Sequence, residues 1–275
     1  MRIGFVVGLV AACGPGAHST GVDAGADAPG SAAGDGGTDV SLVYAHSGTM
    51  LYRVDSTSFT TVAIGPFNID GESLTDLAVD KNEHIVGITL DRLYAIDSAT
   101  GSATLIKSLS QSATGFTSLS YIPTDLTDPN SADILVSAND DGDVYQIDPT
   151  TGSAKQIGSY GMSGSNKIES SGDLIGVRDL GIYATVDVGN QQTNDYLAKI
   201  DPATWQATLI GSGTGFSKIF GLGFWAGTIY GFVDGGDNAG KMITIDSTSG
   251  VGTLASSGTV EWYGAGVTTD APVIE

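Results

Sequence analysis

The sequence predicts an all-β fold, a five-bladed β-propeller, from three observations. A hydrophobic strand that ends in aspartate recurs five times, with its aspartates at Asp55, Asp97, Asp148, Asp201 and Asp246. Successive aspartates are 42, 51, 53 and 45 residues apart, which is the length of a four-stranded propeller blade and too long for a leucine-rich or hexapeptide repeat. Apolar residues with helical spacing are almost absent, so the repeats consist of strands.

The first blade starts without an innermost strand. Residues 41–45, 50–55 and 60–64 supply its three outer strands. The last predicted strand, residues 262–268, has no further strand after it. Because these incomplete ends complement each other, we expect the C-terminal strand to join the first blade and close the ring. Such closure removes the exposed sheet edges through which β-proteins aggregate.

The second blade is the clearest, with strands predicted at residues 73–79, 84–90, 92–97 and 103–109. A turn from Asp97 to Gly101 joins its last two strands. In such a turn the Asp carboxylate accepts hydrogen bonds from the following main-chain amides, and Gly adopts a positive φ. We expect the recurrent aspartates to be structural, because residues that repeat in every blade hold the blades together.

The remaining three blades begin at innermost strands predicted for residues 116–122, 171–177 and 219–225. The fourth blade carries a long insert around residues 186–195, before its third strand. Two merged blades would produce the same spacing, so six blades remain an alternative.

The segment before the predicted propeller, residues 39–275, has the features of an export signal. Residues 1–12 combine a charged start, a short apolar run and small residues, as a signal peptide does. Val10-Ala11-Ala12-Cys13 has the form of a bacterial lipobox. The segment therefore resembles a lipoprotein signal peptide, which implies cleavage before Cys13 and acylation of its thiol; the alternative is an ordinary secretory signal. Residues 13–38 are then the lipidated cysteine followed by a tether. We expect this tether to be disordered, because it contains almost no large apolar side chain.

The composition excludes several classes of function. A net charge of -20 repels phosphate backbones, so nucleic acid is not an expected partner. One cysteine and three histidines are too few for a zinc or iron–sulfur centre, and we expect no required cofactor. Calcium is a candidate ligand of the Asp- and Gly-rich loops at residues 139–143 and 234–238. Neither loop has the EF-hand spacing, and Asp-Gly hairpin turns are the simpler explanation of both.

One position of the innermost strands carries only small or acidic residues. Alignment of the five strands places the following residues in this column: Asp76, Ser118, Asp173, Gly221 and Gly264. Side chains alternate between faces along a strand, so the column faces one environment. We expect this to be the central channel, with Asp76 and Asp173 opposite each other. With Ser118 they are candidate ligand-binding residues, and the alternative is that they are solvated channel-lining residues.

Three tryptophans complete the set of candidate ligand-binding residues. Trp225 and Trp262 lie in innermost strands, where aromatic residues ordinarily pack between blades. Trp205 occupies a turn position at which other blades carry Gly, so we expect Trp205 to be the more exposed. Exposed rings beside polar groups can stack on sugars.

Nucleophilic catalysis of the Ser/His/Asp type is disfavoured. The two histidines of the predicted propeller, His46 and His84, lie in or beside second strands of blades. We expect both to be away from the Asp76 and Asp173 column, where no base would then be available.

The repeat L-Y-x-I-D-x-x-T-G at residues 93–101 resembles the repeats of bacterial exported propellers of the YVTN or quinoprotein-like kind. The closing run from Trp262 to Thr269 resembles that of lipoprotein propellers of uncharacterised function. The resemblance covers roughly residues 41–272 and rests on blade-forming positions. It implies the fold and export, and it carries over no quinone-binding residues.

We expect a monomeric lipoprotein, anchored in the outer membrane, that binds a protein partner or a glycan at the cell envelope. Gly14 follows Cys13 in place of the Asp that retains lipoproteins at the inner membrane of enteric bacteria. Two alternatives stay open: a glycoside-acting enzyme that uses Asp76 and Asp173, and a structural scaffold with no small-molecule site. The enzyme would need these carboxyl groups roughly 5 to 9.5 Å apart in an open cleft.

Overall fold

The computed structural model describes residues 41–110, 115–189, 193–236 and 239–274. The predicted signal peptide, Cys13 and the tether lie outside the described residues. Within the described residues the secondary structure consists of strands. No helix among them is long and apolar enough to cross a membrane.

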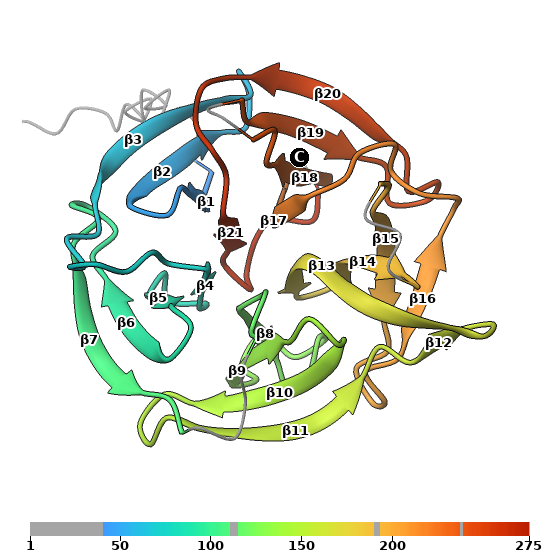
Figure 1. The fold of residues 1–275 in the computed structure, drawn as a ribbon, viewed down its shortest axis with the longest axis horizontal. Coiled ribbons are helices and arrows are strands. Elements are labelled where there is room, and N and C mark those ends of the chain that lie inside the picture. The colour runs from blue at the N-terminus through green and yellow to red at the C-terminus, as the bar shows by residue number, and fades with distance from the viewer. Residues whose placement is uncertain (1–40, 111–114, 190–192, 237–238, 275) are drawn as a thin grey trace, which may run out of the picture. The chain divides into compact units, whose positions relative to one another are not determined.

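The strands form five sheets that surround a common centre as the blades of a propeller (Figure 1). From the centre outward, blade 1 contains β21 (Gly264–Val267), β1 (Val43–His46), β2 (Met50–Asp55) and β3 (Thr60–Pro66). Blade 2 contains β4 (Asp76–Val79), β5 (Ile85–Ile88), β6 (Arg92–Ile96) and β7 (Ala103–Ser108). Blade 3 contains β8 (Ser120–Pro123), β9 (Asp133–Ala138), β10 (Asp143–Asp148) and β11 (Ser153–Ser159).

Blade 4 has a fifth, two-residue strand beside its innermost strand. In sheet order it contains β12 (Met162–Ser163), β13 (Asn166–Val177), β14 (Gly181–Val188), β15 (Tyr196–Ile200) and β16 (Ala207–Ile210). Blade 5 contains β17 (Ile219–Trp225), β18 (Thr228–Val233), β19 (Lys241–Ile245) and β20 (Gly252–Ser257).

The ring closes through the two ends of the propeller, as predicted. Strand β21 pairs antiparallel with β1, with Ala45 opposite Ala265 and His46 opposite Gly264. The prediction of five blades is confirmed. The insert around residues 186–195 connects β14 to β15 within blade 4, and these two strands pair directly, so it does not mark a sixth blade.

The innermost strand of blade 3 starts later than residues 116–122 predict. Only an isolated bridge joins Phe116 to Asn139, and β8 begins at Ser120. At Ser118, hydrogen bonds from side chains replace main-chain pairing between the two strands. The Ser118 hydroxyl accepts the main-chain N–H of Ala138 at 2.8 Å, and Ser137 donates its hydroxyl to the Ser118 carbonyl. Serine side chains compete with main-chain pairing in this way.

The recurrent aspartates are structural, as predicted. Asp97 Oδ1 accepts the main-chain N–H groups of Ala99 and Thr100 at 2.9 and 2.8 Å. Gly101 then adopts a φ of 78°. The equivalent aspartates of the other blades accept hydrogen bonds in the same positions: Asp55, Asp148, Asp201 and Asp246. Each carboxylate thus stabilises the turn between the two outer strands of its blade.

Main-chain hydrogen bonds also join neighbouring blades at the outer rim. In each bond, one partner lies at the start of a blade's outermost strand or in the turn before that strand. The other partner lies in the segment that follows the outermost strand of the preceding blade. Four such bonds occur, of 2.8 to 3.0 Å: Ala103 to Phe67, Ser110 to Gly152, Ala207 to Tyr160 and Gly252 to Thr214. They span the seams between blades 1 and 2, 2 and 3, 3 and 4, and 4 and 5.

Candidate functional site

The column of small and acidic residues lies at the centre of the propeller and is closed to solvent. Asp76, Ser118 and Asp173 have no exposed surface. Gly221 and Gly264 occupy the same position in blades 5 and 1, and each closely approaches the adjacent blade. A Cβ at Gly221 would overlap main-chain atoms of Ala265. The column therefore packs the five blades together.

The carboxyl groups of Asp76 and Asp173 each connect two adjacent blades. Asp76 Oδ1 accepts the N–H of Leu77 at 2.8 Å, and its Oδ2 accepts the N–H of Leu119 in blade 3 at 2.6 Å. Asp173 Oδ1 accepts the N–H of Leu174 at 2.6 Å, and its Oδ2 accepts the N–H of Leu222 in blade 5 at 2.7 Å. All four oxygens are thus occupied by main-chain donors.

A β-bulge directs the Asp173 side chain toward the centre. The pairing register between β13 and β14 shifts between Ser170 and Leu174, and a bulge changes the direction of the side chains it contains. The main-chain N–H of Asp173 donates to Thr185 Oγ1 at 3.0 Å in place of a ladder partner. The irregular segment therefore leaves no unpaired main-chain N–H at this residue.

The two carboxyl groups also lie close enough to influence each other, as the sequence alignment of blades 2 and 4 predicted. Burial raises the pKa of both groups well above the ordinary value, and the nearby Asp173 charge raises the pKa of Asp76 further. Two buried carboxyl groups close together cannot both ionise at low cost, so their burial favours a protonated pair.

His46 lies beside this pair, so the expectation that it is away from the column is wrong. Its Nε2 is 3.8 Å from Asp76 Oδ1, because His46 pairs with Gly264, which has no side chain to separate the two groups. Burial lowers the pKa of His46 to about 4. The ring is therefore neutral at pH 7, and its Nδ1 donates to the Ser47 carbonyl at 2.9 Å.

This geometry does not supply what a glycosidase requires. Such an enzyme places its two carboxyl groups roughly 5 to 9.5 Å apart in a cleft that admits a sugar and a water molecule. Asp76 and Asp173 are instead fully buried, with every carboxyl oxygen accepting a main-chain N–H. Their arrangement stabilises the contact between blades.

The segment after β21 connects blade 1 to three other blades. Thr268 donates its hydroxyl to the Asp80 carbonyl of blade 2 at 3.0 Å, and Thr269 donates to Asp133 of blade 3 at 2.8 Å. The N–H of Ala226 in blade 5 donates to the Pro272 carbonyl at 2.8 Å. Residues 268–272 therefore reinforce the closure that β21 begins.

Arg178 of blade 4 anchors the same segment. Its guanidinium forms ion pairs of 2.6 Å with both Asp133 and Asp270, and it donates to the Thr269 hydroxyl at 2.7 Å. The Arg178 and Asp133 side chains are only 7% and 5% exposed. A buried guanidinium of this kind is stabilised by complete pairing.

The three candidate tryptophans pack inside the propeller. Trp205, Trp225 and Trp262 are 7%, 6% and 5% exposed, so the expectation that Trp205 is exposed is wrong. Trp205 adopts a φ of 63° at the turn position that Gly holds in blades 2, 3 and 5, and its Cβ lies against Gly158 of blade 3. A glycine in the adjacent outer strand thus makes room for this indole, and sequence reasoning missed that complementarity.

The acidic loops are held by local hydrogen bonds. Asn139 Oδ1 accepts the N–H of Asp143 at 2.9 Å, and Gly142 has a φ of 73°. Asp234 Oδ1 accepts the N–H of Gly236 at 2.8 Å; residues 237 and 238 of the second predicted loop lie outside the described residues. Among the described residues no three His, Cys, Asp or Glu side chains are placed to hold a metal ion.

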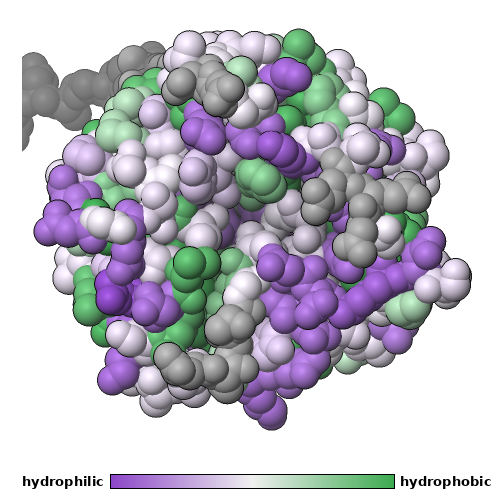
Figure 2. Space-filling view, in the orientation of Figure 1, coloured by the Kyte–Doolittle hydropathy of each residue, from purple (hydrophilic) through white to green (hydrophobic). Residues whose placement is uncertain are grey.

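A separate acidic group occurs in blade 4, and the sequence reading did not identify it. Asp187 lies opposite Glu169 in the pairing of β13 with β14. Burial, followed by the Glu169 charge, raises the pKa of Asp187 to about 6. Burial raises the pKa of Asp195 to about 7, and the Asp187 charge contributes in the same direction. On the face shown in Figure 2 the centre is hollowed, and hydrophilic side chains gather beside it over β13.

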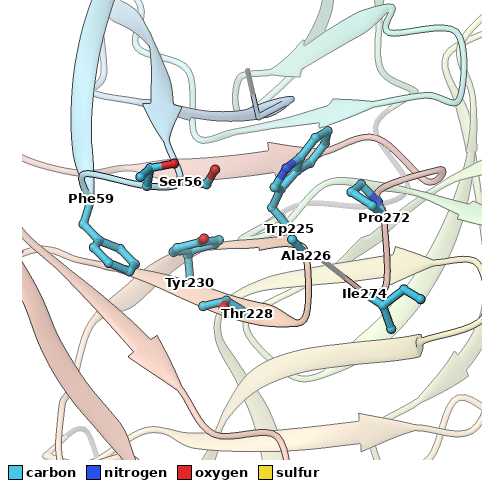
Figure 3. A pocket seen from close by; sticks show the side chains of 9 residues that line it. Ser56, Phe59, Trp225, Ala226, Thr228, Tyr230, Pro272 and Ile274 are labelled. Atoms are coloured by element: carbon cyan, nitrogen blue, oxygen red, sulfur yellow. The ribbon is translucent and has the colours of Figure 1, made fainter. Parts of the chain in front are cut away.

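A pocket lies at the seam between blades 1 and 5. Its volume is about 490 Å³, within the range of about 300 to 1,000 Å³ found for small-molecule sites. Three segments surround it: the turn between β2 and β3, the turn between β17 and β18 with the start of β18, and the C-terminal segment (Figure 3). Of the predicted site residues, only Trp225 contributes to its wall.

No protein-family model matches the chain, and no curated protein matches its sequence. Solved structures match its fold. A protein of unknown function from Bacteroides thetaiotaomicron has a TM-score of 0.51 and 13% identity over 83% of this chain and 63% of that one. A symmetrical protein of de novo evolutionary origin has a TM-score of 0.48 and 17% identity over 85% of this chain and 99% of that one. BamB from Moraxella catarrhalis has a TM-score of 0.36 and 12% identity over 78% and 69%.

This chain spans about 63% of the length of the Bacteroides thetaiotaomicron protein. At these identities the likeness concerns the fold alone. The chain is therefore a five-bladed β-propeller, and its function must be argued from its own residues.

Proposed function

We propose that this chain is an exported, lipid-anchored β-propeller that acts as a binding module for a protein partner or a glycan at the bacterial cell envelope. One observation carries the proposal. Every carboxyl oxygen of Asp76 and Asp173 accepts a main-chain N–H, and both side chains are fully buried. The central groups with acid–base chemistry are therefore engaged in holding blades together. Recognition falls to the outer surface of the propeller, its loops and its seams.

The envelope location rests on the N-terminal sequence. Val10-Ala11-Ala12-Cys13 has the form of a lipobox, and the Gly-, Ala- and Asp-rich residues 14–38 suit a tether. At roughly 5 to 6 Å times the square root of its length, such a tether would hold the propeller a few nanometres from the lipid. Gly14 after Cys13 favours the outer membrane.

The anchor is tested with the full chain and a Cys13→Ser variant expressed in a bacterial host. We expect the full chain to partition into Triton X-114 and to incorporate labelled fatty acid. Cys13→Ser should lose both properties without a change in the thermal unfolding of the propeller. Equal partitioning of the two proteins into water would overturn the anchor.

The binding function is tested by chemical cross-linking of the full chain in intact cells, beside calorimetric titration with glycans and with calcium. A specific cross-linked protein or a saturable glycan titration is the expected result. Absence of both would contradict the proposal and favour a scaffold without a ligand. A calcium-dependent rise in the unfolding temperature would assign calcium to the acidic loops.

A further inference from the structure

The seam between blades 1 and 5 differs from the other four at the outer rim. Each of the other seams has a main-chain hydrogen bond there. In the described part of the chain, no such bond joins the residues after β20 to the start of β3. The pocket of about 490 Å³ lies at this same seam. The ring is thus less tightly closed between blades 1 and 5, and the space that remains is large enough for a small molecule.

Phe59 lies at this seam. It ends the turn between β2 and β3 with a φ of 54°, at the position where Gly101, Gly152 and Gly250 end the equivalent turns. At those three glycines a Cβ would overlap main-chain carbonyl groups of the preceding blade. A side chain at this position therefore needs extra space in the preceding blade, which Gly158 provides for Trp205.

The backbone of Phe59 is strained, and burial does not explain the strain. A bulky residue with positive φ is disfavoured by contacts between its Cβ and the main chain, and strained residues gather at sites of function. Trp205, at the same position in blade 4, is 7% exposed and fills a gap in front of Gly158. Phe59 is only half-buried and lines the pocket, with its ring 6.1 Å from that of Tyr230.

The pocket wall combines aromatic rings with hydroxyl groups. Phe59, Tyr230 and Trp225 supply the rings, while Ser56, Thr57 and Thr228 supply hydroxyl groups. Figure 3 shows these side chains around one space, with Ser56 and Phe59 on one side and Trp225 on the other. Hydroxyl groups both donate and accept hydrogen bonds. Such a wall suits a ligand that has apolar faces and many hydroxyl groups.

Charge narrows the class of ligand. Among the described residues that line the pocket there is no Asp, Glu, Lys, Arg or His, so a charged ligand would find no counter-charge there. The net charge of -20 also repels anions.

We propose that the pocket between blades 1 and 5 binds an uncharged sugar, with the Phe59 ring packed on a face of the sugar and the hydroxyl groups of Ser56, Thr57 and Thr228 bonded to its edge. This inference rests on the proposed function and specifies the case in which the bound partner is a glycan. Tyr230 and Trp225 complete the wall of the pocket.

The test is isothermal titration of the full chain with maltotriose, cellotriose and chitotriose, and with choline as a cationic probe. We expect one neutral sugar to bind. Phe59→Gly should weaken that binding by about ten-fold or more, since it removes the aromatic ring that packs on the sugar. Glycine is the residue that three other blades hold in this turn, so this variant should unfold at the same or a higher temperature.

Two further variants control the experiment. Thr228→Val removes a lining hydroxyl at constant shape and should also weaken binding. Val62→Ala removes an apolar side chain that is 62% exposed on the neighbouring strand β3 and should leave binding unchanged. Equal sugar affinity of Phe59→Gly and the parent chain would overturn the inference, as would binding of choline and no sugar. If no sugar binds while a protein partner is cross-linked, the inference fails and the proposed function stands.

Discussion

Asp76 and Asp173 meet at the centre of the propeller, where their carboxyl groups interact and are fully buried. One comes from blade 2 and the other from blade 4. Each accepts a main-chain N–H from the next blade, at 2.6 Å for Asp76 and 2.7 Å for Asp173. The two side chains therefore join four of the five blades.

Replacement of Asp76 by Asn should destabilise the protein by about 1 to 3 kcal/mol, because an amide NH2 cannot accept one of the two main-chain N–H groups. Those groups belong to Leu77 and Leu119. Urea unfolding monitored by circular dichroism measures the change. Asp141→Asn is the matched control, since Asp141 is 69% exposed, and it should change stability by less than about 0.5 kcal/mol. Equal stability of the two variants would show that the central pair does not hold the blades.

The protein should lose stability as the pH rises from 6.5 to 8. The raised pKa values of Asp76, Asp173, Asp187 and Asp195 mean that the folded chain retains protons which the unfolded chain releases near pH 3.9. Their contribution is complete below about pH 3.9 and is lost as the pH rises through the folded values, which are about 6 for Asp187 and about 7 for Asp195. Buried His46 acts in the opposite direction at lower pH: its pKa is lowered to about 4, so its contribution rises with pH until the unfolded value of 6.5 is passed. A thermal unfolding temperature that is constant or rises between pH 6.5 and 8 would contradict the expectation.

Asp187→Asn should stabilise the protein at pH 8 and change it little at pH 5. Above its pKa of about 6 the carboxylate is charged and lies opposite Glu169, and like charges in that position destabilise a sheet. The amide removes the repulsion. Thermal unfolding at the two pH values measures the difference between them. A variant that is equally stabilised, or destabilised, at both would refute the electrostatic cause.

Gly264→Ala should destabilise the propeller by about 1 to 3 kcal/mol, as overpacking of a tight core does. The added methyl would overlap both Asp76 Oδ1 and His46 Nε2. Gly258→Ala is the matched control, because a Cβ there meets no atom within 4 Å. Chemical denaturation of both variants is the measurement. The account expects the control to stay within about 0.5 kcal/mol of the parent chain, and similar losses in both would refute the packing argument.

Arg178→Met should cost about 3 to 5 kcal/mol, because it leaves the buried Asp133 carboxylate without its guanidinium partner. The loss should appear as earlier unfolding in denaturant. Lys167→Met breaks an ion pair with Asp141 in which both side chains are well exposed, and such pairs contribute less than about 1 kcal/mol. Comparable effects of the two substitutions would contradict the role of Arg178 in anchoring the C-terminal segment.

The architecture could be predicted because it depends on local and periodic features. The spacing of the recurrent aspartates gave the blade length, and the unmatched strands at the two ends gave the pairing of β21 with β1. The alignment of innermost strands also brought Asp76 and Asp173 together. Their burial could not be predicted, since it depends on how closely Gly221 and Gly264 let the blades approach.

The seam pocket was missed for a related reason. Phe59 and Trp205 occupy the same position of equivalent turns. An aromatic residue in place of glycine there was visible in the sequence for both. The two side chains differ in burial because Trp205 faces a glycine, Gly158, whereas Phe59 lies beside Tyr230. That difference depends on contacts between blades, and an alignment of equivalent sequence positions does not show such contacts.

The most direct test of the central claim compares sugar binding by two variants of the full chain, Phe59→Gly and Asp173→Asn, with unfolding temperature measured on the same samples. The account predicts that Phe59→Gly loses binding and keeps its stability, while Asp173→Asn loses stability and binds normally where it is folded. The reverse result, in which folded Asp173→Asn fails to bind and Phe59→Gly binds like the parent chain, would place recognition at the centre of the propeller and contradict the account.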